Sequence, residues 1–231
     1  MKTVNRTISI GDIHGCSIAL NTLIKAINPK PQDRIVTLGD VIDWGPNSRS
    51  VLEQLIQLGK RCHLIPLLGN HEEMLLKARS SQSEFIYWTQ YGGLDTLDSY
   101  GKRSIWDDIP AAHYQFLESC QSFHEADHHI FVHANFDPTL PMPKQPDQLL
   151  RWEHIDPTKS RQHISRKTVI LGHTPQKSGE ILDLGSVVCI DTFCHGGGWL
   201  TALDVLTGKI WQSNQQGELR EIQHEPKESK L

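Results

Sequence analysis

The sequence predicts an α/β protein in which two packed, mixed β-sheets are flanked by helices. In the first half, short apolar runs bounded by glycine alternate with segments of helical periodicity, which indicates parallel strands joined by right-handed crossovers. From residue 187 onward, short strands and hairpin turns replace the helices. The 231 residues fit one domain with one sizeable core. We expect this domain over residues 1–223 and a charged, disordered tail over residues 224–231.

The first half is predicted to contain three units, each made of a strand and a helix. Each strand is a run of apolar and β-branched residues, and each following helix carries apolar residues at helical spacing. Asn28-Pro29 ends the first helix and Gly59 ends the second. The strands are expected at residues 7–10, 35–38 and 63–68, and the helices after Gly15, after Asn47-Ser48 and over residues 72–78.

The remainder is expected to form an insertion followed by short strands. Residues 79–127 are rich in aromatic and polar side chains and are interpreted as a mostly helical insertion. Thr207-Gly208 and Gln216-Gly217 indicate hairpin turns between late strands. These later strands are predicted at residues 130–132, 168–171, 187–190, 200–205, 210–212 and 219–222.

Composition limits the function classes. The net charge of −4 and the pI near 6.3 leave no overall basic surface, so general nucleic-acid binding is not favoured. No stretch approaches the length of a membrane span, and we expect a soluble, cytoplasmic protein. The final Ser229-Lys230-Leu231 would be a peroxisomal address only in a eukaryotic cell. The five cysteines are expected to be reduced and buried, and whether Cys16 senses oxidation is left open.

Five of the predicted strands end on residues that bind metals well. Ligands of open α/β sheets gather at the carboxyl ends of strands, so these side chains should converge on one rim. Each of them alone could be an ordinary turn or packing residue, but five successive strand ends make that explanation weak. The residues are Asp12 and His14, then Asp40, then Asn70 and His71, then His133, and finally His173.

The donor types indicate two catalytic metal ions. Carboxylate, imidazole and amide donors without thiolates suit manganese, iron, zinc or similar ions better than a structural zinc site. A single ion rarely uses as many as six protein ligands, whereas a bridging carboxylate lets two ions share a set of this size, and Asp40 is the natural bridge. Most other histidines lack such a position. His195 is intermediate, because the following Gly196-Gly197-Gly198 could approach the site.

These turns resemble the motifs of a known enzyme family. The segments 11–15, 39–45 and 69–72, followed by His133 and Gly172-His173, are similar to those of the phosphoprotein phosphatase branch of the calcineurin-like metallophosphoesterases. The resemblance covers residues 7–205 and is greatest to small bacterial serine/threonine phosphatases and symmetrical diadenosine tetraphosphatases. It implies the calcineurin-like metallophosphoesterase sandwich as the fold. It also implies hydrolysis by in-line attack of a hydroxide that bridges two divalent metal ions, with manganese favoured and iron, zinc or nickel as alternatives.

The resemblance also implies a role for each residue. One metal ion would take Asp12, His14 and Asp40, and the other would take Asp40, Asn70, His133 and His173. His71 would be the general acid that protonates the leaving oxygen, with Asp43 as its orienting carboxylate. Asn70 would also contact the substrate phosphate.

Two positions depart from the family pattern. Trp44 stands where family members usually carry a phosphate-binding arginine, and Leu68 stands where protein phosphatases of this type often carry another. Arg151 resembles the later phosphate-binding arginine of bacterial members, although it could be an ordinary surface residue. Trp44 could pack without a role, stack on a nucleobase or aryl group of the substrate, or weaken catalysis.

Three functions follow from these observations. The leading hypothesis is a metallophosphatase of the serine/threonine or dual-specificity protein phosphatase type, acting on phosphorylated protein or a small phosphoester. The second is a symmetrical dinucleoside tetraphosphate hydrolase, which an aromatic base platform at Trp44 would favour. The third is a catalytically weak phosphate-binding regulatory module that keeps the metals but lacks the arginine clamp.

Overall fold

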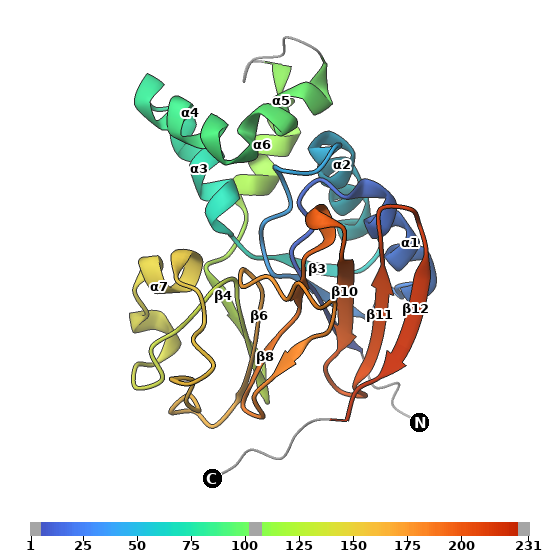
Figure 1. The fold of residues 1–231 in the computed structure, drawn as a ribbon, viewed down its shortest axis with the longest axis vertical. Helices are drawn as coiled ribbons and strands as arrows, with labels where there is room; N and C mark the ends of the chain where they lie inside the picture. The colour runs from blue at the N-terminus through green and yellow to red at the C-terminus, as the bar shows by residue number, and fades with distance from the viewer. Residues whose placement is uncertain (1–5, 102–107, 226–231) are drawn as a thin grey trace.

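Two mixed β-sheets pack face to face in the computed structural model, which describes residues 6–101 and 108–225 (Figure 1). The predicted fold class is therefore confirmed. The first sheet has the strand order β12-β11-β10-β1-β2-β3, with β9 beside β10. Its strands are β1 (Thr7–Ile10), β2 (Arg34–Thr37), β3 (His63–Pro66), β9 (Asp191–Thr192), β10 (Trp199–Asp204), β11 (Lys209–Ser213) and β12 (Leu219–Gln223).

β1 joins the two halves of the chain within this sheet. It runs parallel to β2, with Ser9 opposite Val36, and antiparallel to β10, with Ser9 opposite Leu203. The crossovers from β1 to β2 and from β2 to β3 are the helices α1 (Ser17–Ile27) and α2 (Ser48–Gly59). The predicted parallel half is confirmed, and the late hairpins extend the same sheet.

The second sheet has the order β4-β5-β6-β8-β7. Its three central strands are parallel, and β4 and β7 pair antiparallel at the two edges. The sheets therefore do not correspond to the two halves of the sequence, since residues 187–189 pair with the second sheet and the later strands with the first. The strands are β4 (Phe123–Glu125), β5 (His129–Val132), β6 (Thr168–Leu171), β7 (Leu182–Asp183) and β8 (Val187–Cys189).

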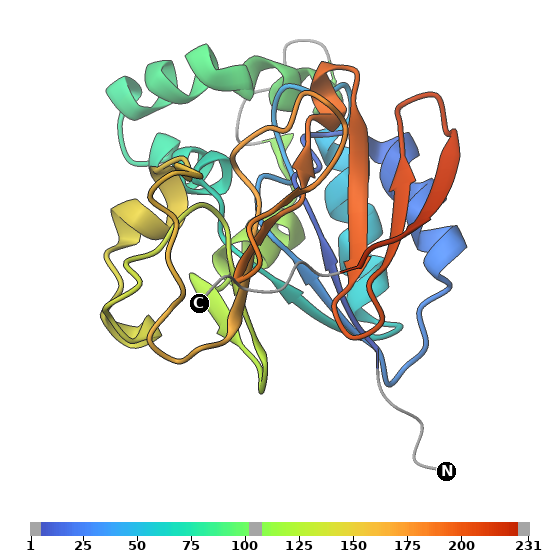
Figure 2. The same cartoon turned by 60° about the horizontal axis from the view of Figure 1, so that its bottom comes forward.

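The described part of the insertion is mostly helical, and its end is a strand. Residues 123–125 form β4, because this segment pairs antiparallel with β5 and completes the sheet edge. Residues 102–107 of the insertion lie outside the described residues. The turned view shows the helices of residues 70–118 over one end of the sheets (Figure 2). The helices are α3 (Asn70–Ala78), α4 (Gln82–Trp88), η1 (Thr89–Gly93), α5 (Leu94–Tyr100) and α6 (Ala111–Glu118), followed later by η3 (Met142–Lys144), α7 (Asp147–Trp152) and η4 (Cys194–Gly196).

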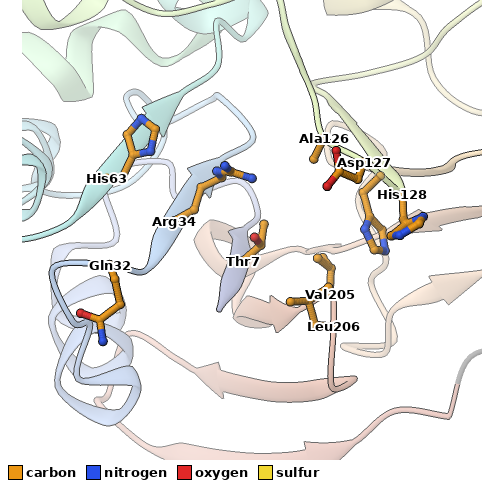
Figure 3. Close-up of a pocket in the computed structure, with 10 residues that line it drawn as sticks. Thr7, Gln32, Arg34, His63, Ala126, Asp127, His128, Val205 and Leu206 are labelled. Carbon is orange, nitrogen blue, oxygen red and sulfur yellow. The ribbon is translucent and has the colours of Figure 1, made fainter. Parts of the chain in front are cut away.

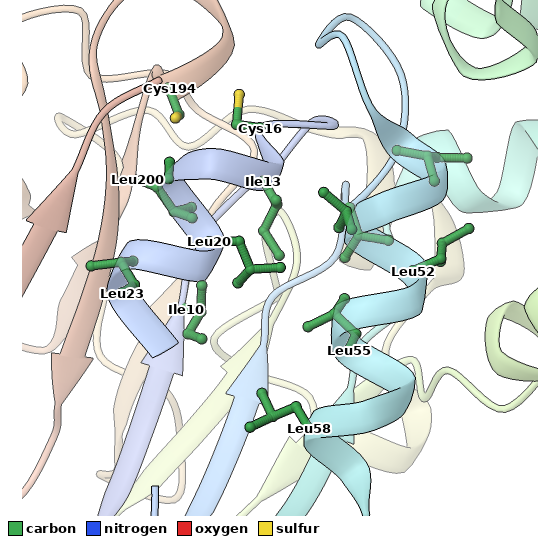
Figure 4. Packing of buried hydrophobic residues seen from close by; sticks show 14 of the residues in the cluster. Ile10, Ile13, Cys16, Leu20, Leu23, Leu52, Leu55, Leu58, Cys194 and Leu200 are labelled. Carbon is green, nitrogen blue, oxygen red and sulfur yellow. The ribbon is translucent and has the colours of Figure 1, made fainter. Parts of the chain in front are cut away.

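Side-chain alternation in the strands produces separate apolar layers. Ile8, Ile10 and Ile35 belong to one apolar cluster with the leucines of α1 and α2. Figure 4 shows Ile10 facing these two helices, which cover the outer face of the first sheet. Val36 and Phe131 pack in the layer between the two sheets. Because successive side chains of a strand point to opposite faces, the register of each strand decides which of its residues lie in which layer.

Several further expectations can be compared with the structure. All five cysteines are free, and four are buried while Cys120 is partly exposed. Among the described residues, no helix combines the length and the apolar character needed to cross a bilayer. Residues 226–231 of the predicted tail lie outside the described residues, whereas His224 contacts Asp183 at 3.1 Å.

Replacing Phe131 tests the apolar layer between the sheets. Phe131 is 0% exposed, so Phe131→Ala should leave a cavity and lower the free energy of unfolding by about 3–5 kcal/mol. The measurement is urea denaturation followed by circular dichroism. Ile86→Ala is the control, because Ile86 is 49% exposed on α4 and its replacement should change stability by less than about 0.5 kcal/mol. A loss of similar size in both variants would contradict this description of the core.

Candidate metal centre

The turns that follow β1, β2, β3, β5 and β6 meet at one end of the two sheets. Their backbones are joined directly, since the amides of Ile13 and His14 both donate to the carbonyl of Asp40. Gly39 has a φ of +99°, and a Cβ atom there would lie 2.6 Å from the backbone nitrogen of Gly69. Only glycine lets the second and third turns approach this closely.

Three of the candidate metal ligands have left-handed backbone conformations that residues other than glycine seldom adopt. The φ angles are 44° at His14, 48° at Asp40 and 61° at His173. Such conformations cost free energy and persist where surrounding structure holds them, typically at functional sites. The backbone conformation of these turns therefore lowers local stability, but it directs the three side chains toward one point.

Four donors converge on the first of two candidate metal positions. Nε2 of His133 lies 3.1 Å from Oδ1 of Asn70, 3.1 Å from Nδ1 of His173 and 3.3 Å from Oδ1 of Asp40. Asp40, His133 and His173 form one of the two groups of potential ligands that the described residues contain. The fourth donor, Asn70, begins α3 and is brought here by the turn after β3.

Backbone carbonyls determine which nitrogen of each ring faces the centre. Nδ1 of His14 donates to Ile42, Nδ1 of His133 to Leu38, and Nε2 of His173 to Trp152, at 2.9, 2.8 and 3.1 Å. The opposite nitrogen of each ring is left to accept or to bind a metal. Such outer hydrogen bonds orient metal-binding histidines.

The chemistry of this donor set fits a cation. Without one, the unprotonated nitrogens of His133 and His173 would face each other at 3.1 Å and repel. Burial lowers the pKa of His133, but the Asp40 carboxylate outweighs it and raises this pKa, so a proton can take that place in the metal-free chain. Burial and His133 lower the pKa of His173 to about 3, which keeps it neutral and able to bind a metal.

The second candidate position is on the other side of Asp40. Oδ2 of Asp40 lies 3.6 Å from Nε2 of His14 and 3.9 Å from Nε2 of His71, whereas Oδ1 faces His133. Asp40 is thus common to both groups. Within the described part of the chain, Asp12 is in neither group, and its carboxylate accepts the backbone amide of His173 at 3.0 Å. The residue that shares a group with His14 and Asp40 is His71 rather than Asp12.

His71 is held by a buried hydrogen-bond network. Its Nδ1 lies 2.8 Å from Oδ2 of Asp43, which also accepts the indole N–H of Trp88 at 2.9 Å, while Oδ1 accepts the hydroxyl of Thr96. Burial alone would lower the pKa of His71, but Asp40 and Asp43 raise it to about 9. A protonated ring can donate a proton and cannot bind a metal. Trp88 and Thr96 come from the helical insertion, where no sequence motif indicated a role.

Buried carboxylates dominate the charge of the site. Burial and the charges of Asp191 and Asp40 raise the pKa of Asp12 well above its usual value, and burial and Asp40 raise that of Glu72 to about 7. Asp40 itself has a lowered pKa, since His133 and His71 outweigh the effect of its burial. Divalent cations would relieve this repulsion among carboxylates.

Asp191 is a site residue that the strand-end pattern could have revealed. It follows the apolar run Val187–Ile190, as Asp12 follows β1, and it is 3% exposed. Burial and Asp40 raise the pKa of Asp191 to about 6. The pattern thus held for a sixth strand end that sequence reasoning missed.

Trp44 and His195 form an aromatic border beside the centre. Trp44 is 45% exposed, and its indole ring lies 6.2 Å from the ring of His71 and 6.4 Å from that of His195. The ring of His195 is 4.5 Å from that of His14, so the glycine-rich segment does bring this histidine to the site. Trp44 also packs on Gly92, where a Cβ atom would lie 2.9 Å from the indole.

Arg151 lies apart from these residues in an ion-pair network of its own. Its guanidinium donates to Glu73 at 3.1 Å, to Ser122 at 3.2 Å and to Asp147 at 3.0 Å, and the residue is 5% exposed. The adjacent Trp152 supplies the carbonyl that orients His173. The guanidinium of Arg151 is thus already engaged by protein groups, of which the Asp147 side chain is 70% exposed.

Comparison with known proteins places this geometry in a family. The family described as calcineurin-like phosphoesterase matches residues 6–205. Serine/threonine-protein phosphatase 1 of Salmonella typhimurium is 31% identical over 206 residues, which cover 83% of this chain and 88% of that protein. A symmetrical bis(5'-nucleosyl)-tetraphosphatase of Janthinobacterium is 31% identical over 133 residues, or 57% of this chain, and the chain spans only 44% of its length.

Solved structures agree at the level of the fold. The cold-active protein-tyrosine phosphatase of a psychrophilic Shewanella has a TM-score of 0.65 and 16% sequence identity, with 95% of this chain and 81% of that chain covered. At this identity the likeness concerns the fold alone. The family match over most of the sequence, together with the two mixed sheets and their shared rim of donors, shows that the chain belongs to the calcineurin-like phosphoesterase family.

Proposed function

We propose that this member of the family is a dinuclear metal-dependent phosphomonoesterase that acts on phosphorylated protein side chains. One observation carries the proposal: the two oxygens of Asp40 face two separate groups of donors, with His71 beside one of them. A carboxylate shared in this way suits a pair of divalent ions, and a protonated imidazole nearby suits a leaving group that must gain a proton.

The proposed ligands are those expected from the sequence. One ion would be held by Asp12, His14 and Asp40, and the other by Asp40, Asn70, His133 and His173, after the carboxylate of Asp12 turns from the amide of His173. We propose manganese as the metal, with iron, zinc or nickel as alternatives. When bound, the ions would neutralise phosphate charge and lower the pKa of a water molecule.

His71 would act as the general acid. Asp43 holds Nδ1 of the ring, so the proton on Nε2 points to the rim where a leaving oxygen would lie. Trp88 and Thr96 hold Asp43 in turn, which fixes the orientation of the imidazolium. The chain thereby presents one mobile proton at a defined atom.

The protein phosphatase hypothesis is supported by the share of this chain that aligns with a protein phosphatase. The similarity to the Salmonella phosphatase spans 83% of this chain, whereas the match to the Janthinobacterium tetraphosphatase spans 57%. A dinucleoside tetraphosphate hydrolase is the second candidate, because the exposed indole of Trp44 could stack on a nucleobase. A module with weak catalysis is the third, given that Arg151 is engaged by Glu73 and Asp147.

A substrate panel tests the proposed function. The full chain would be assayed with manganese, iron, nickel, zinc and magnesium on phosphoserine, phosphothreonine and phosphotyrosine peptides and on diadenosine tetraphosphate. We expect the highest kcat/KM on a phosphopeptide with manganese. Preference for diadenosine tetraphosphate would support the second candidate instead, and metal binding without turnover on any substrate would support the third.

Replacing His71 tests whether this residue acts as a general acid or as a metal ligand. His71→Asn should lower kcat by about 100-fold to 10,000-fold, because the proton donor is lost, while two metal ions remain bound. Metal content would be measured by mass spectrometry on the same samples. The control is His128→Asn, which removes an exposed histidine at the opposite end of the sheets and should leave kcat unchanged. Loss of a metal ion from His71→Asn would show that His71 is a ligand.

Replacing Trp44 tests the missing phosphate clamp. Trp44→Arg should raise kcat/KM on an aryl phosphate by about tenfold, because it restores charge-assisted hydrogen bonds to the phosphate. Trp44→Gln is the matched control, since it removes the indole without adding a charge. An unchanged or lower kcat/KM in Trp44→Arg would contradict the idea that the indole weakens phosphate binding.

A further inference from the structure

A second polar cleft lies at the end of the sheets opposite the metal centre. It has a volume of about 250 Å³, which is less than the roughly 300–1,000 Å³ of clefts that hold drug-sized ligands. Figure 3 shows Arg34 and His63 on one side and Asp127 and His128 on the other. Its size and polar lining suit a small polar ligand.

Strand register explains why basic side chains meet there. Arg34 is opposite both Thr7 and His63 in the first sheet, and two residues further along β2 its face carries Val36, which packs between the sheets. In the second sheet, His129 precedes Phe131 on the same face of β5. The layer between the sheets is therefore apolar in its middle and basic where these strands begin.

Among the described residues, Arg34 has no partner for its charge. Its Nε is buried and makes no hydrogen bond, and throughout residues 6–101 and 108–225 no carboxylate forms an ion pair with its guanidinium. Asp127 lines the same cleft without pairing with it. Buried groups of this kind are rare in proteins, and an ion or ligand is one explanation for them.

His124 is a second residue near the cleft whose buried polar atom lacks a hydrogen-bond partner. It is opposite Phe131 and stacks on that ring, and its Nε2 is also buried without a hydrogen-bond partner. Burial, and then the charges of Arg34 and His63, lower the pKa of His124. Two buried polar nitrogens of neighbouring side chains, Nε of Arg34 and Nε2 of His124, are thus without a hydrogen-bond partner.

The histidines of this cleft do not form a metal site. The groups of potential metal ligands within the described residues are both at the other end of the sheets. The guanidinium of Arg34 would also repel a cation. The charge of Arg34, with which Asp127 of the same cleft forms no ion pair, instead calls for an anion whose oxygens can accept from a planar, forked donor, and phosphate oxygens do this well.

We propose that the cleft formed by Thr7, Arg34, His63, His128 and His129 is a second binding site, specific for a phosphate-type oxyanion. The occupant is free phosphate or the phosphoryl group of a small organic molecule, with Arg34 as its main contact. The site is separate from the metal centre, and it does not depend on which phosphoester the centre hydrolyses.

Isothermal titration calorimetry on the metal-loaded full chain, freed of excess metal, tests this site. Inorganic phosphate should fill two sites per chain in the unmodified protein and one in Arg34→Gln, where the affinity of the lost site falls at least about tenfold. Lys60→Gln is the matched control, because it removes the same charge from an exposed position and should keep both sites. Hydrolytic activity should be equal in all three proteins.

A second titrant distinguishes the sources of the anion. Phenylphosphonate carries the phosphoryl group on an organic ring and cannot be hydrolysed at its carbon–phosphorus bond. Filling of the second site by phosphate alone identifies free phosphate, and filling by phenylphosphonate identifies an organic ligand. If neither titrant gives a second site that Arg34→Gln removes, the proposal is wrong. The melting temperature of Arg34→Gln without ligand should not fall, because a charge without a partner has been removed.

Discussion

The buried carboxylate of Glu72 holds the turns of the candidate metal centre in place. It accepts the backbone amides of Asp40 at 2.7 Å, Val41 at 2.8 Å and Gly69 at 3.0 Å. These bonds fasten the turn after β2 to the start of α3, so Asp40 and Asn70 cannot move independently. A neutral glutamine could replace only part of this network, because its NH₂ group cannot accept an amide hydrogen. The relative positions of Asp40 and Asn70 therefore depend on this one side chain, which is 0% exposed.

The carboxylate of Glu72 also adds to the repulsion among several buried carboxylates, which the fold alone does not compensate. Asp12, Asp40, Glu72 and Asp191 are all buried within one region, and histidines supply the nearest compensating charge. Protonated histidines can neutralise part of it only while they are not bound to a metal. Binding of cations and release of protons are therefore coupled here, as is general for metal sites. The backbone conformations of His14, Asp40 and His173 add a local cost that must be balanced by the rest of the fold.

Much of the fold and the rim could be predicted, because strand periodicity and glycine turns are local signals. The strand-end pattern identified Asp40 and His133 before any contact was known, and the structure brings them within 3.3 Å. Contacts between segments that are far apart along the chain leave no comparable signal in the sequence. Nothing near Trp88 or Thr96 indicated that they would hold Asp43, and the ion pair of Arg151 with Glu73 arises only from the packing of α7 near α3. Residues 123–125 were assigned to the helical insertion because the pairing that makes them a strand lies in another segment.

The strand β2 links the two ends of the molecule in a way that affects how its sequence can change. Arg34 begins this strand and Asp40 follows it, so the unpaired positive charge and the shared carboxylate are six residues apart, at most roughly 20 Å of chain. Inserting or deleting one residue between them would turn one of the two to the opposite face of the sheet. The segment can therefore tolerate exchanges of apolar side chains but not a change in length. Relatives that have both sites should therefore have the same number of residues between them.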